Sequence, residues 1–292
     1  MKNLLNISDL SKNDFDSILN LAKSIKPYNE DCLKNKNIGL IFEKNSTRTR
    51  LSFQVGINQL NGKYIDIKLE ELNLQRVESF EDTFEIMSCY LDALIFRTTN
   101  HEKLNLASKY FNKPIINALS DISHPCQAIS DIYTLKEHFQ KEDGFKIVWC
   151  GDLNNVLFSI LESMKFLDSS KIDVFTDKKI YEKNHHKFPK IDNISYHFEI
   201  DDKILELADC VMTDVFNSMN DKEDKEVILK KFMVNQGLME KTSNSTVFMH
   251  CLPAKIGSEV SSDVIKGSKS IVLKQAKNRM VAQRGIMKWL EL

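Results

Sequence analysis

The stretch Ser46-Thr47-Arg48-Thr49-Arg50 follows an apolar run at residues 38–42 and opens a segment with helical spacing. Leu51 and Val55 repeat at the four-residue interval of one helix face. The order predicts a strand leading into a helix whose first turn carries hydroxyl and guanidinium groups. Helix N-termini bear unpaired N–H groups and a partial positive charge, so this turn predicts a site for a phosphate-sized dianion. An N-cap followed by solvated arginines is the plainer alternative.

Composition and charge are those of a globular protein. The 292 residues are enough for two domains of ordinary size. With 40 Lys+Arg against 41 Asp+Glu, the chain lacks the basic excess of a nucleic-acid binder. Polar residues interrupt residues 1–10, so we expect no signal peptide. No apolar run approaches the roughly 20 residues that span a bilayer, so we expect no membrane partner.

The six cysteines are scattered, and none forms a Cys-x-x-Cys pair. This spacing is typical of reduced thiols in a cytosolic protein. We therefore predict a cytoplasmic location.

Strand-like and helix-like segments alternate, which predicts an α/β protein with parallel sheets. Strand-like runs lie at residues 38–42, 64–69, 93–96, 146–150, 173–175, 210–213, 246–249 and 270–273. Helix-like segments lie at residues 11–26, 79–90, 102–111, 127–139, 156–167, 222–232, 260–265 and 276–290. The long helical segment that ends near residue 140 precedes a new strand. We therefore predict a domain boundary there, with residues 1–135 on one side and 136–275 on the other.

Several cofactor motifs are absent from the sequence. No Walker-type phosphate loop occurs, which argues against that nucleotide site. Gly151 follows a strand and precedes a helix, but the second and third glycines of a dinucleotide fingerprint are missing. His185 and His186 lack supporting carboxylates or thiols, so solvated loop histidines are the better interpretation than a metal site.

Four further stretches place polar groups where open α/β sheets bind ligands. They are Phe96-Arg97-Thr98, His124-Pro125-Cys126-Gln127, residues 214–219 and His250-Cys251-Leu252-Pro253-Ala254. Singly they have plain explanations: a surface arginine, a helix cap, a turn and a proline-containing loop. Together with residues 46–50, they predict one ligand site.

In this order and spacing, the motifs resemble the transcarbamoylase family, and specifically the ornithine carbamoyltransferases. The matching passages are residues 42–53, 96–98, 123–128, 151–156, 214–219, 250–254 and 275–280. The resemblance runs along the whole chain. It implies two domains, each a mainly parallel sheet flanked by helices, with the C-terminal helix 276–292 crossing back to the N-terminal domain. It also implies a homotrimer with sites near the subunit interfaces.

The reaction of this family is attack by the neutral δ-amine of L-ornithine on the carbonyl carbon of carbamoyl phosphate. A tetrahedral intermediate then collapses to citrulline and phosphate. The resemblance assigns carbamoyl phosphate to Ser46, Thr47, Arg48, Thr49, Arg97, His124, Gln127, Leu252 and Arg279. Arg97 would bridge phosphate and carbonyl oxygen, His124 would donate to that oxygen, and Gln127 would hold the carbamoyl NH2. No metal or organic cofactor is implied, because arginines and dipoles supply the charge.

The resemblance assigns the amine substrate to the second domain. Asp214 would bind the ammonium group, and Asn155, Ser218 and Met219 would bind the rest of the amino-acid head. Cys251 and the Leu252 carbonyl would face the reacting amine. Because amine attack needs no covalent intermediate, we interpret Cys251 as an orienting group. The predicted catalytic set is Arg97, His124, Asp214 and Cys251.

Two departures from the family pattern leave contacts open. Asn73 replaces a glutamine that reaches a neighbouring subunit, and Asn220 replaces the glycine after Ser218-Met219.

Two other functions stay open as well. One is a sister transcarbamoylase for putrescine, N-acetylornithine or aspartate, and the other is a catalytically silent scaffold. His250-Cys251-Leu252-Pro253 argues against aspartate, and the complete anion-binding set argues against a silent homologue. The sequence leaves the anabolic or catabolic direction open.

Overall fold

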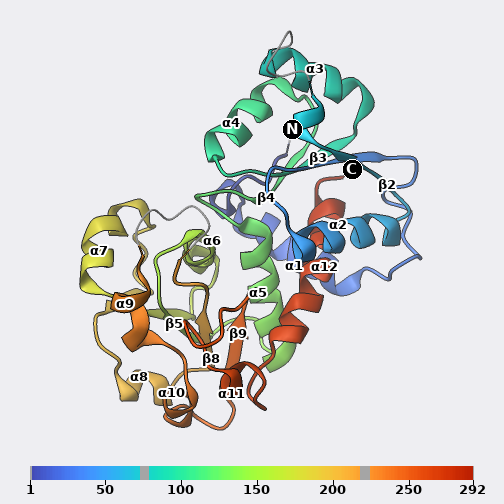
Figure 1. Ribbon diagram of the computed structural model, residues 1–292. Helices are drawn as coiled ribbons and strands as arrows, with labels where there is room; N and C mark the ends of the chain where they lie inside the picture. Colours follow the sequence, from blue (N-terminus) through green and yellow to red (C-terminus); the bar gives the residue numbers. More distant parts are fainter. Residues whose placement is uncertain (1, 73–78, 218–223, 292) are drawn as a thin grey trace. The chain divides into compact units, whose positions relative to one another are not determined.

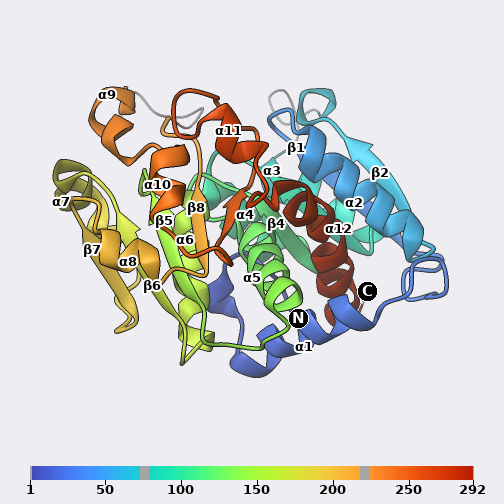
Figure 2. The same ribbon diagram turned by 90° about the horizontal axis from the view of Figure 1, so that it is seen from below.

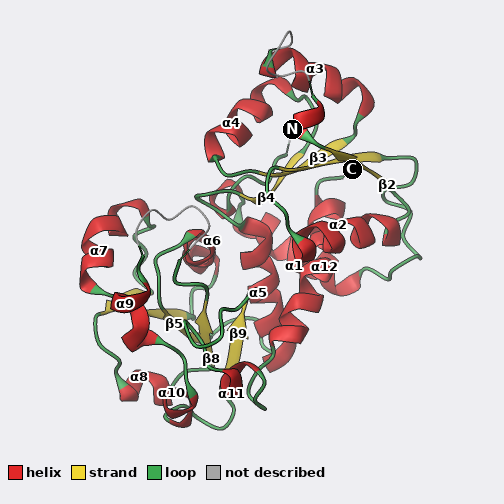
Figure 3. Cartoon of the chain, in the orientation of Figure 1, coloured by secondary structure: helices red, strands yellow, loops and turns green. Residues whose placement is uncertain are grey.

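The alternating apolar and helical segments form a four-stranded and a five-stranded parallel sheet within the described residues. The computed structural model describes residues 2–72, 79–217 and 224–291 (Figure 1). One compact unit comprises Met1–Tyr133 with Asn278–Leu292, and the other comprises Thr134–Lys277. The predicted class is confirmed: each unit is a parallel sheet flanked by helices (Figure 3).

The first unit has the strand order β2-β1-β3-β4. Its strands are β1 (Asn37–Phe42), β2 (Lys63–Ile67), β3 (Ala93–Arg97) and β4 (Ile115–Leu119). Its helices are α1 (Lys12–Ser24), α2 (Thr47–Gln59), α3 (Phe80–Tyr90), α4 (His101–Tyr110), the start of α5 (Pro125–Phe139) and the end of α12 (Val272–Trp289). Helices α3 and α4 cover one face of the sheet (Figure 1). There Phe84 and Leu104 pack with Ile41 and Phe96 in one buried cluster.

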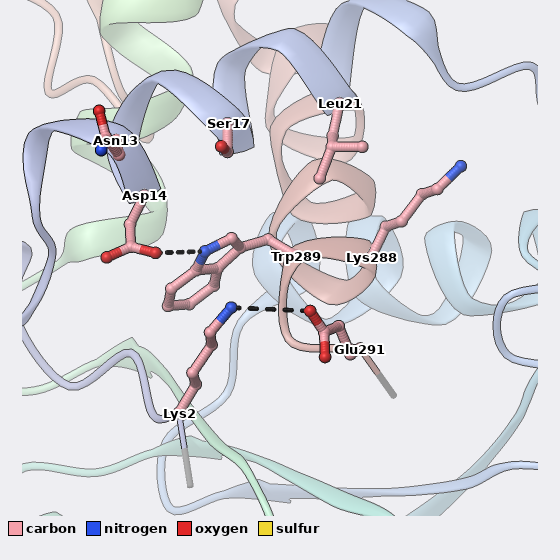
Figure 4. A pocket seen from close by; sticks show the side chains of 8 residues that line it. All are labelled: Lys2, Asn13, Asp14, Ser17, Leu21, Lys288, Trp289 and Glu291. Atoms are coloured by element: carbon pink, nitrogen blue, oxygen red, sulfur yellow. Dashed lines mark hydrogen bonds and ion pairs between the residues drawn. The ribbon is translucent and has the colours of Figure 1, made fainter.

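Helix α12 returns to the N-terminal elements and lies beside α2 and α1 (Figure 2). Gly285 permits the close approach, because a Cβ there would stand 2.6 Å from the Ile18 carbonyl oxygen of α1. The Trp289 indole N–H donates to the Asp14 carboxylate over 2.9 Å (Figure 4). The predicted crossing of the C-terminal helix back to the N-terminal domain is therefore confirmed. The pocket whose lining residues Figure 4 shows includes none of the predicted site residues.

The second unit has the strand order β7-β6-β5-β8-β9. Its strands are β5 (Lys146–Cys150), β6 (Lys171–Phe175), β7 (Ile194–His197), β8 (Cys210–Thr213) and β9 (Val247–His250). Its further helices are α6 (Asn155–Ser163), α7 (Lys178–Asn184), α8 (Asp202–Glu206), α9 (Glu226–Leu229), α10 (Gln236–Glu240) and α11 (Ser262–Ile265). Apart from the exposed first residues Lys146 and Lys171, the three central strands are buried, as expected for a parallel sheet covered on both faces.

The predicted strand at residues 270–273 is wrong. Ser270 forms only an isolated bridge with Phe248, and α12 begins at Val272. A short apolar run can be a buried strand or a helix start. Here Val272 is buried and Leu273 is 79% exposed, but both already belong to α12, so the run forms no strand.

Strands β4 and β7 were not predicted from the sequence. The polar residue Asn117 interrupts the apolar pattern of β4, so the sequence does not mark this strand. In the fold, the buried Asn117 side chain is accommodated because its amide N–H donates to the Leu5 carbonyl over 2.8 Å. β7 is an edge strand with half-buried side chains, so it carries no apolar run. The short helices α7, α8 and α10 were also missed. The helix predicted at 222–232 is α9 followed by a 3-10 turn, Lys230–Phe232, and residues 222–223 lie outside the described residues.

Candidate active site

The junction of β1 and α2 forms the predicted hydroxyl-rich turn. Ser46 is the N-cap of α2, and its Oγ accepts from the Thr49 backbone N–H over 3.3 Å. Thr47, Arg48 and Thr49 make up the first helical turn. The plainer interpretation as an N-cap is thus correct for Ser46, but it does not account for the arginines.

The two arginines of this turn have different surroundings. Arg50 lies 3.8 Å from the Asp66 carboxylate and stacks over the Phe42 ring at 5.0 Å. Arg48 is half-buried, and it forms no ion pair with the described part of the chain. Arg50 therefore braces α2 against β1 and β2, and the role predicted for Arg48 with phosphate stays a prediction.

Two further arginines reach this turn from distant parts of the chain. The Arg97 Nη1 at the end of β3 lies 3.3 Å from Ser46 Oγ and 3.4 Å from Thr49 Oγ1. Arg279, on α12, donates to the same Thr49 oxygen over 2.5 Å and is 4% exposed. Two guanidinium groups thus meet at a helix N-terminus, where the dipole is also positive. This concentration of positive charge suits a phosphate dianion.

His124 lies directly before α5 and is buried in the same unit. Burial and the positive charges of Arg279 and Arg97 hold the pKa of His124 well below its ordinary value. The imidazole is therefore neutral at neutral pH and carries one N–H donor. A neutral donor of this kind can polarise a carbonyl without adding a charge.

Gln127, in the first turn of α5, is completely buried. Its Nε2 donates to Asp131 Oδ1 over 2.8 Å, whereas its Oε1 accepts no hydrogen bond from the described residues. An unsatisfied buried acceptor costs stability, and it offers a binding group for an amide N–H. The role predicted for Gln127 with the carbamoyl NH2 stays a prediction.

Asp214 follows β8 in the second unit and is 7% exposed. Its Oδ1 accepts from the Cys251 thiol over 3.1 Å, and its Oδ2 accepts from Asn154 Nδ2 over 2.8 Å. Asn154 is also the N-cap of α6, accepting from the N–H groups of Val156 and Leu157. The sequence prediction named the neighbouring Asn155 and missed Asn154. An asparagine in N-cap position between a strand and a helix was the signal that could have found it.

Ser218 and Met219 lie outside the described residues, as do Asn73 and Asn220. Asn155 is the half-buried first residue of α6. The roles predicted for Ser218, Met219 and Asn155 with the amine substrate stay predictions.

The loop after β9 is held by a buried histidine. His250 Nδ1 accepts the Leu252 N–H over 2.9 Å, so its Nε2 carries the hydrogen and donates to Glu259 Oε1 over 3.2 Å. Leu252 has a φ of 57°, and its bond to Pro253 is cis. His250 thus fixes the backbone that presents Cys251 and the Leu252 carbonyl. The sequence prediction missed Glu259, since no motif marks an isolated buried carboxylate.

Asp214, His250 and Cys251 offer oxygen, nitrogen and sulfur atoms within 4.8 Å of one another. This donor set could hold a metal ion such as zinc. Both His250 nitrogens are already engaged, by Leu252 and Glu259, so a metal ion would have to displace one of these bonds.

Comparisons with known proteins cover the whole chain. The model of the aspartate/ornithine carbamoyltransferase carbamoyl-P binding domain matches residues 2–137. The model of the Asp/Orn binding domain of the same family matches residues 143–290.

Individual relatives are similar over nearly their full lengths. An ornithine carbamoyltransferase from Agrobacterium fabrum is 38% identical, covering 99% of this chain and 97% of the relative. One from Methanococcus aeolicus is 37% identical over 98% of both chains. The crystal structure of ornithine carbamoyltransferase from Burkholderia thailandensis matches with a TM-score of 0.89 at 29% identity, covering 100% of this chain and 99% of that one.

Proposed function

Because the chain belongs to the aspartate/ornithine carbamoyltransferase family, we propose that it is an enzyme that transfers the carbamoyl group of carbamoyl phosphate to L-ornithine. The products are L-citrulline and phosphate. The names of its full-length relatives support ornithine over putrescine or N-acetylornithine as the amine substrate. The single observation that carries the proposal is the meeting of Arg97 and Arg279 at Thr49, at the N-terminus of α2.

In this proposal the N-terminal domain, residues 1–135 with the C-terminal helix 276–292, binds carbamoyl phosphate. The hydroxyls of Ser46, Thr47 and Thr49 and the N–H groups of the first turn of α2 bind the phosphate. Arg48 and Arg279 neutralise its charge, as helix N-termini and guanidinium groups do for anions elsewhere. The description of the first family model as a carbamoyl-P binding domain supports this assignment.

The carbonyl group is polarised by the remaining residues of that domain. Arg97 bridges a phosphate oxygen and the carbonyl oxygen, and neutral His124 donates its N–H to the same oxygen. Both donors are aimed at the oxygen on which negative charge develops, where such groups stabilise the transition state most. Gln127 Oε1 accepts an N–H from the carbamoyl NH2, which fixes the plane of the group under attack.

The domain of residues 136–275 binds the amine substrate. Asp214 binds its ammonium group, with Asn155, Ser218 and Met219 at the amino-acid head. Asn154 and Cys251 hold the Asp214 carboxylate by the two hydrogen bonds described above. Cys251 and the Leu252 carbonyl orient the neutral δ-amine, and Leu252 also contacts the carbamoyl group. These assignments come from the family resemblance and the description of the second family model.

The proposed step needs no covalent enzyme intermediate. The lone pair of the δ-nitrogen forms the new C–N bond, and the carbonyl π electrons move to the oxygen beside Arg97 and His124. The oxyanion then re-forms the C=O bond while the C–O bond to phosphate breaks. The departing phosphate takes that electron pair and accepts the proton that the nitrogen loses. Atoms and charge balance without a thiolate.

A homotrimer is part of the proposal. Several apolar side chains of the first unit are exposed, including Leu51 on α2, Ile65 on β2 and Tyr90 on α3, which is 72% exposed. A subunit interface on this unit would bury such groups, and the trimer itself is what the family resemblance implies. Light scattering at micromolar concentration should give three times the 33.7 kDa mass of the chain. A monomer mass would contradict the trimer.

The cellular role and location are further parts of the proposal. We infer a role in arginine biosynthesis, because the proposed reaction makes citrulline and a similar solved structure, from Campylobacter jejuni, is named an anabolic ornithine carbamoyltransferase. All six cysteines are free thiols, which supports a reducing compartment such as the cytoplasm. Among the described residues, no helix has the length and apolar character to cross a membrane.

A ureido-product assay tests the function directly. The purified chain is incubated with carbamoyl phosphate and, in separate reactions, ornithine, N-acetylornithine, putrescine or aspartate. We expect product with ornithine and at most traces with the others. Product with putrescine but not with ornithine would refute the proposal, and so would the absence of product with all four amines.

A further inference from the structure

Glu43 is the first residue after β1, and its side chain joins the loop that follows β3. Its backbone N–H donates to the Arg97 carbonyl over 3.0 Å. Its carboxylate Oε2 accepts from the Thr98 hydroxyl at 2.5 Å and from the Thr99 backbone N–H at 3.0 Å. The side chain is only 11% exposed, so these bonds are largely shielded from water. Glu43 therefore holds both residues that follow Arg97.

Arg97 needs such support because the sheet is irregular beside it. Phe96 of β3 pairs with Asn117 of β4, whereas Arg97 pairs with Leu119, so one residue of β4 is skipped. A register shift of this kind turns side chains away from the regular ladder direction. On the other side of β3, toward β1, the hydrogen bonds of Glu43 to Arg97, Thr98 and Thr99 hold the backbone that the irregular pairing with β4 leaves less constrained. They fix the backbone that aims the Arg97 guanidinium at Ser46 and Thr49.

The other carboxylate oxygen of Glu43 lies 2.5 Å from Lys103 Nζ. Burial alone would raise the pKa of Glu43, but the hydrogen bonds from Lys103, Thr98 and Thr99 outweigh it and lower the pKa. Lys103 is 44% exposed, and ion pairs at such positions contribute only about 0–1 kcal/mol to stability. The ion pair alone therefore does not account for a carboxylate that is only 11% exposed beside the anion site.

We propose that Glu43 is a positioning residue that holds Arg97 at the N-terminus of α2 through Thr98 and Thr99. Its carboxylate is occupied by these contacts, so it acts through Arg97 and does not touch a substrate. The inference rests on the proposed function, because Arg97 matters there as the group that binds phosphate and the carbonyl oxygen.

A double-mutant cycle tests whether Glu43 acts through Arg97. The variants are Glu43→Ala, Arg97→Met and the double variant, all made in the full chain. Two readouts are measured: the Kd of inorganic phosphate, from its protection against thermal unfolding, and kcat/KM for carbamoyl phosphate at saturating ornithine. Lys103→Met is the matched control, because it removes the ion pair but leaves the bonds to Thr98 and Thr99.

With Arg97 present, we expect Glu43→Ala to weaken phosphate binding and kcat/KM by about tenfold, within the usual range of coupling between contacting residues. In the Arg97→Met background, the same change should cost less than about threefold, because its target is gone. Lys103→Met should stay within about threefold of the wild type, because Lys103 is 44% exposed and the bonds from Thr98 and Thr99 to the carboxylate remain. Glu43→Gln, which keeps one acceptor oxygen, should fall between wild type and Glu43→Ala, and it replaces the alanine variant if that one fails to fold.

Equal losses from Glu43→Ala in both backgrounds would overturn the proposal, since Glu43 would then act independently of Arg97. A Lys103→Met variant as damaged as Glu43→Ala would overturn it as well, in favour of the ion pair. Failure of the wild type to form citrulline would refute the proposed function instead. The phosphate arm of the cycle would still decide whether Glu43 positions Arg97.

Discussion

Replacing Arg97 by methionine should remove most of the activity while leaving the fold nearly intact. Its guanidinium contacts two neutral hydroxyls at 3.3 and 3.4 Å, which is at the long limit for hydrogen bonds. Such bonds contribute about 0.5–1.5 kcal/mol each, so unfolding should become easier by only about 1–2 kcal/mol. Loss of one donor to a developing oxyanion costs about 3–4 kcal/mol in the transition state, or roughly 10²–10³-fold in kcat/KM.

Arg50→Met is the matched control, because Arg50 lies in the helical turn that Arg97 contacts and carries the same charge. It contacts Asp66 at 3.8 Å and the Phe42 ring, both structural partners. Loss of a cation–π contact and a long ion pair should reduce stability by about 1 kcal/mol. Because Arg50 faces these partners, kcat/KM should stay within about tenfold of the wild type.

Initial rates of citrulline formation give kcat/KM for carbamoyl phosphate, and urea denaturation gives the stability of each variant. A fully folded Arg97→Met variant with kcat/KM near the wild-type value would refute the role of Arg97. Equal damage from Arg50→Met would show that net charge, and not the position of the guanidinium, carries the effect.

Three other variants test separate parts of the structure. His124→Gln should reduce the pH dependence of stability. Below the ordinary histidine pKa of 6.5, the unfolded chain binds a proton at residue 124 that the folded chain does not, so the free energy of unfolding should fall by up to about 1.4 kcal/mol per pH unit more in the wild type than in the variant. Wild type and variant whose urea midpoints change equally between pH 7.5 and pH 5.5 would contradict this. Cys251→Ser should keep turnover within about tenfold of the wild type, because serine can still donate to Asp214, and complete inactivation of a folded variant would argue for a covalent thiolate. Gly285→Ala should destabilise the chain by about 1–3 kcal/mol in a urea titration, because the added Cβ would stand 2.6 Å from the Ile18 carbonyl oxygen. Gly56→Ala is the control and should be neutral, because its Cβ would lie 3.4 Å from the flexible side chain of Met287.

Local features of the chain were readable from its sequence. Ser11 caps α1 with Asp14 three residues on, as the spacing predicts. The strand–helix junction at residues 46–50 follows from an apolar run and a helical pattern only a few residues apart. The errors fall where local signals are weak: the edge strand β7, the polar interruption in β4, and the short run at 270–273.

The chemistry of the site depends on contacts between distant residues. Arg279 meets Thr49 across 230 positions of sequence, and the Asp214 carboxylate accepts from Asn154 and Cys251, which come from separate segments. The low pKa of His124 arises from burial near Arg279 and Arg97, which no local pattern encodes. Glu259 was missed for the same reason, whereas Asn154 was overlooked although its N-cap position is a local signal.

The sequence by itself determined the Ser46-Thr47-Arg48-Thr49-Arg50 turn, since capping and helical periodicity act over three or four residues. Only the tertiary structure decided what each arginine does. Sheet pairing placed Arg97, and the return of α12 placed Arg279 beside that turn, while Arg50 was directed to Phe42 and Asp66. The physical reason is that a guanidinium on a long side chain has many possible partners, and the packed backbone selects among them.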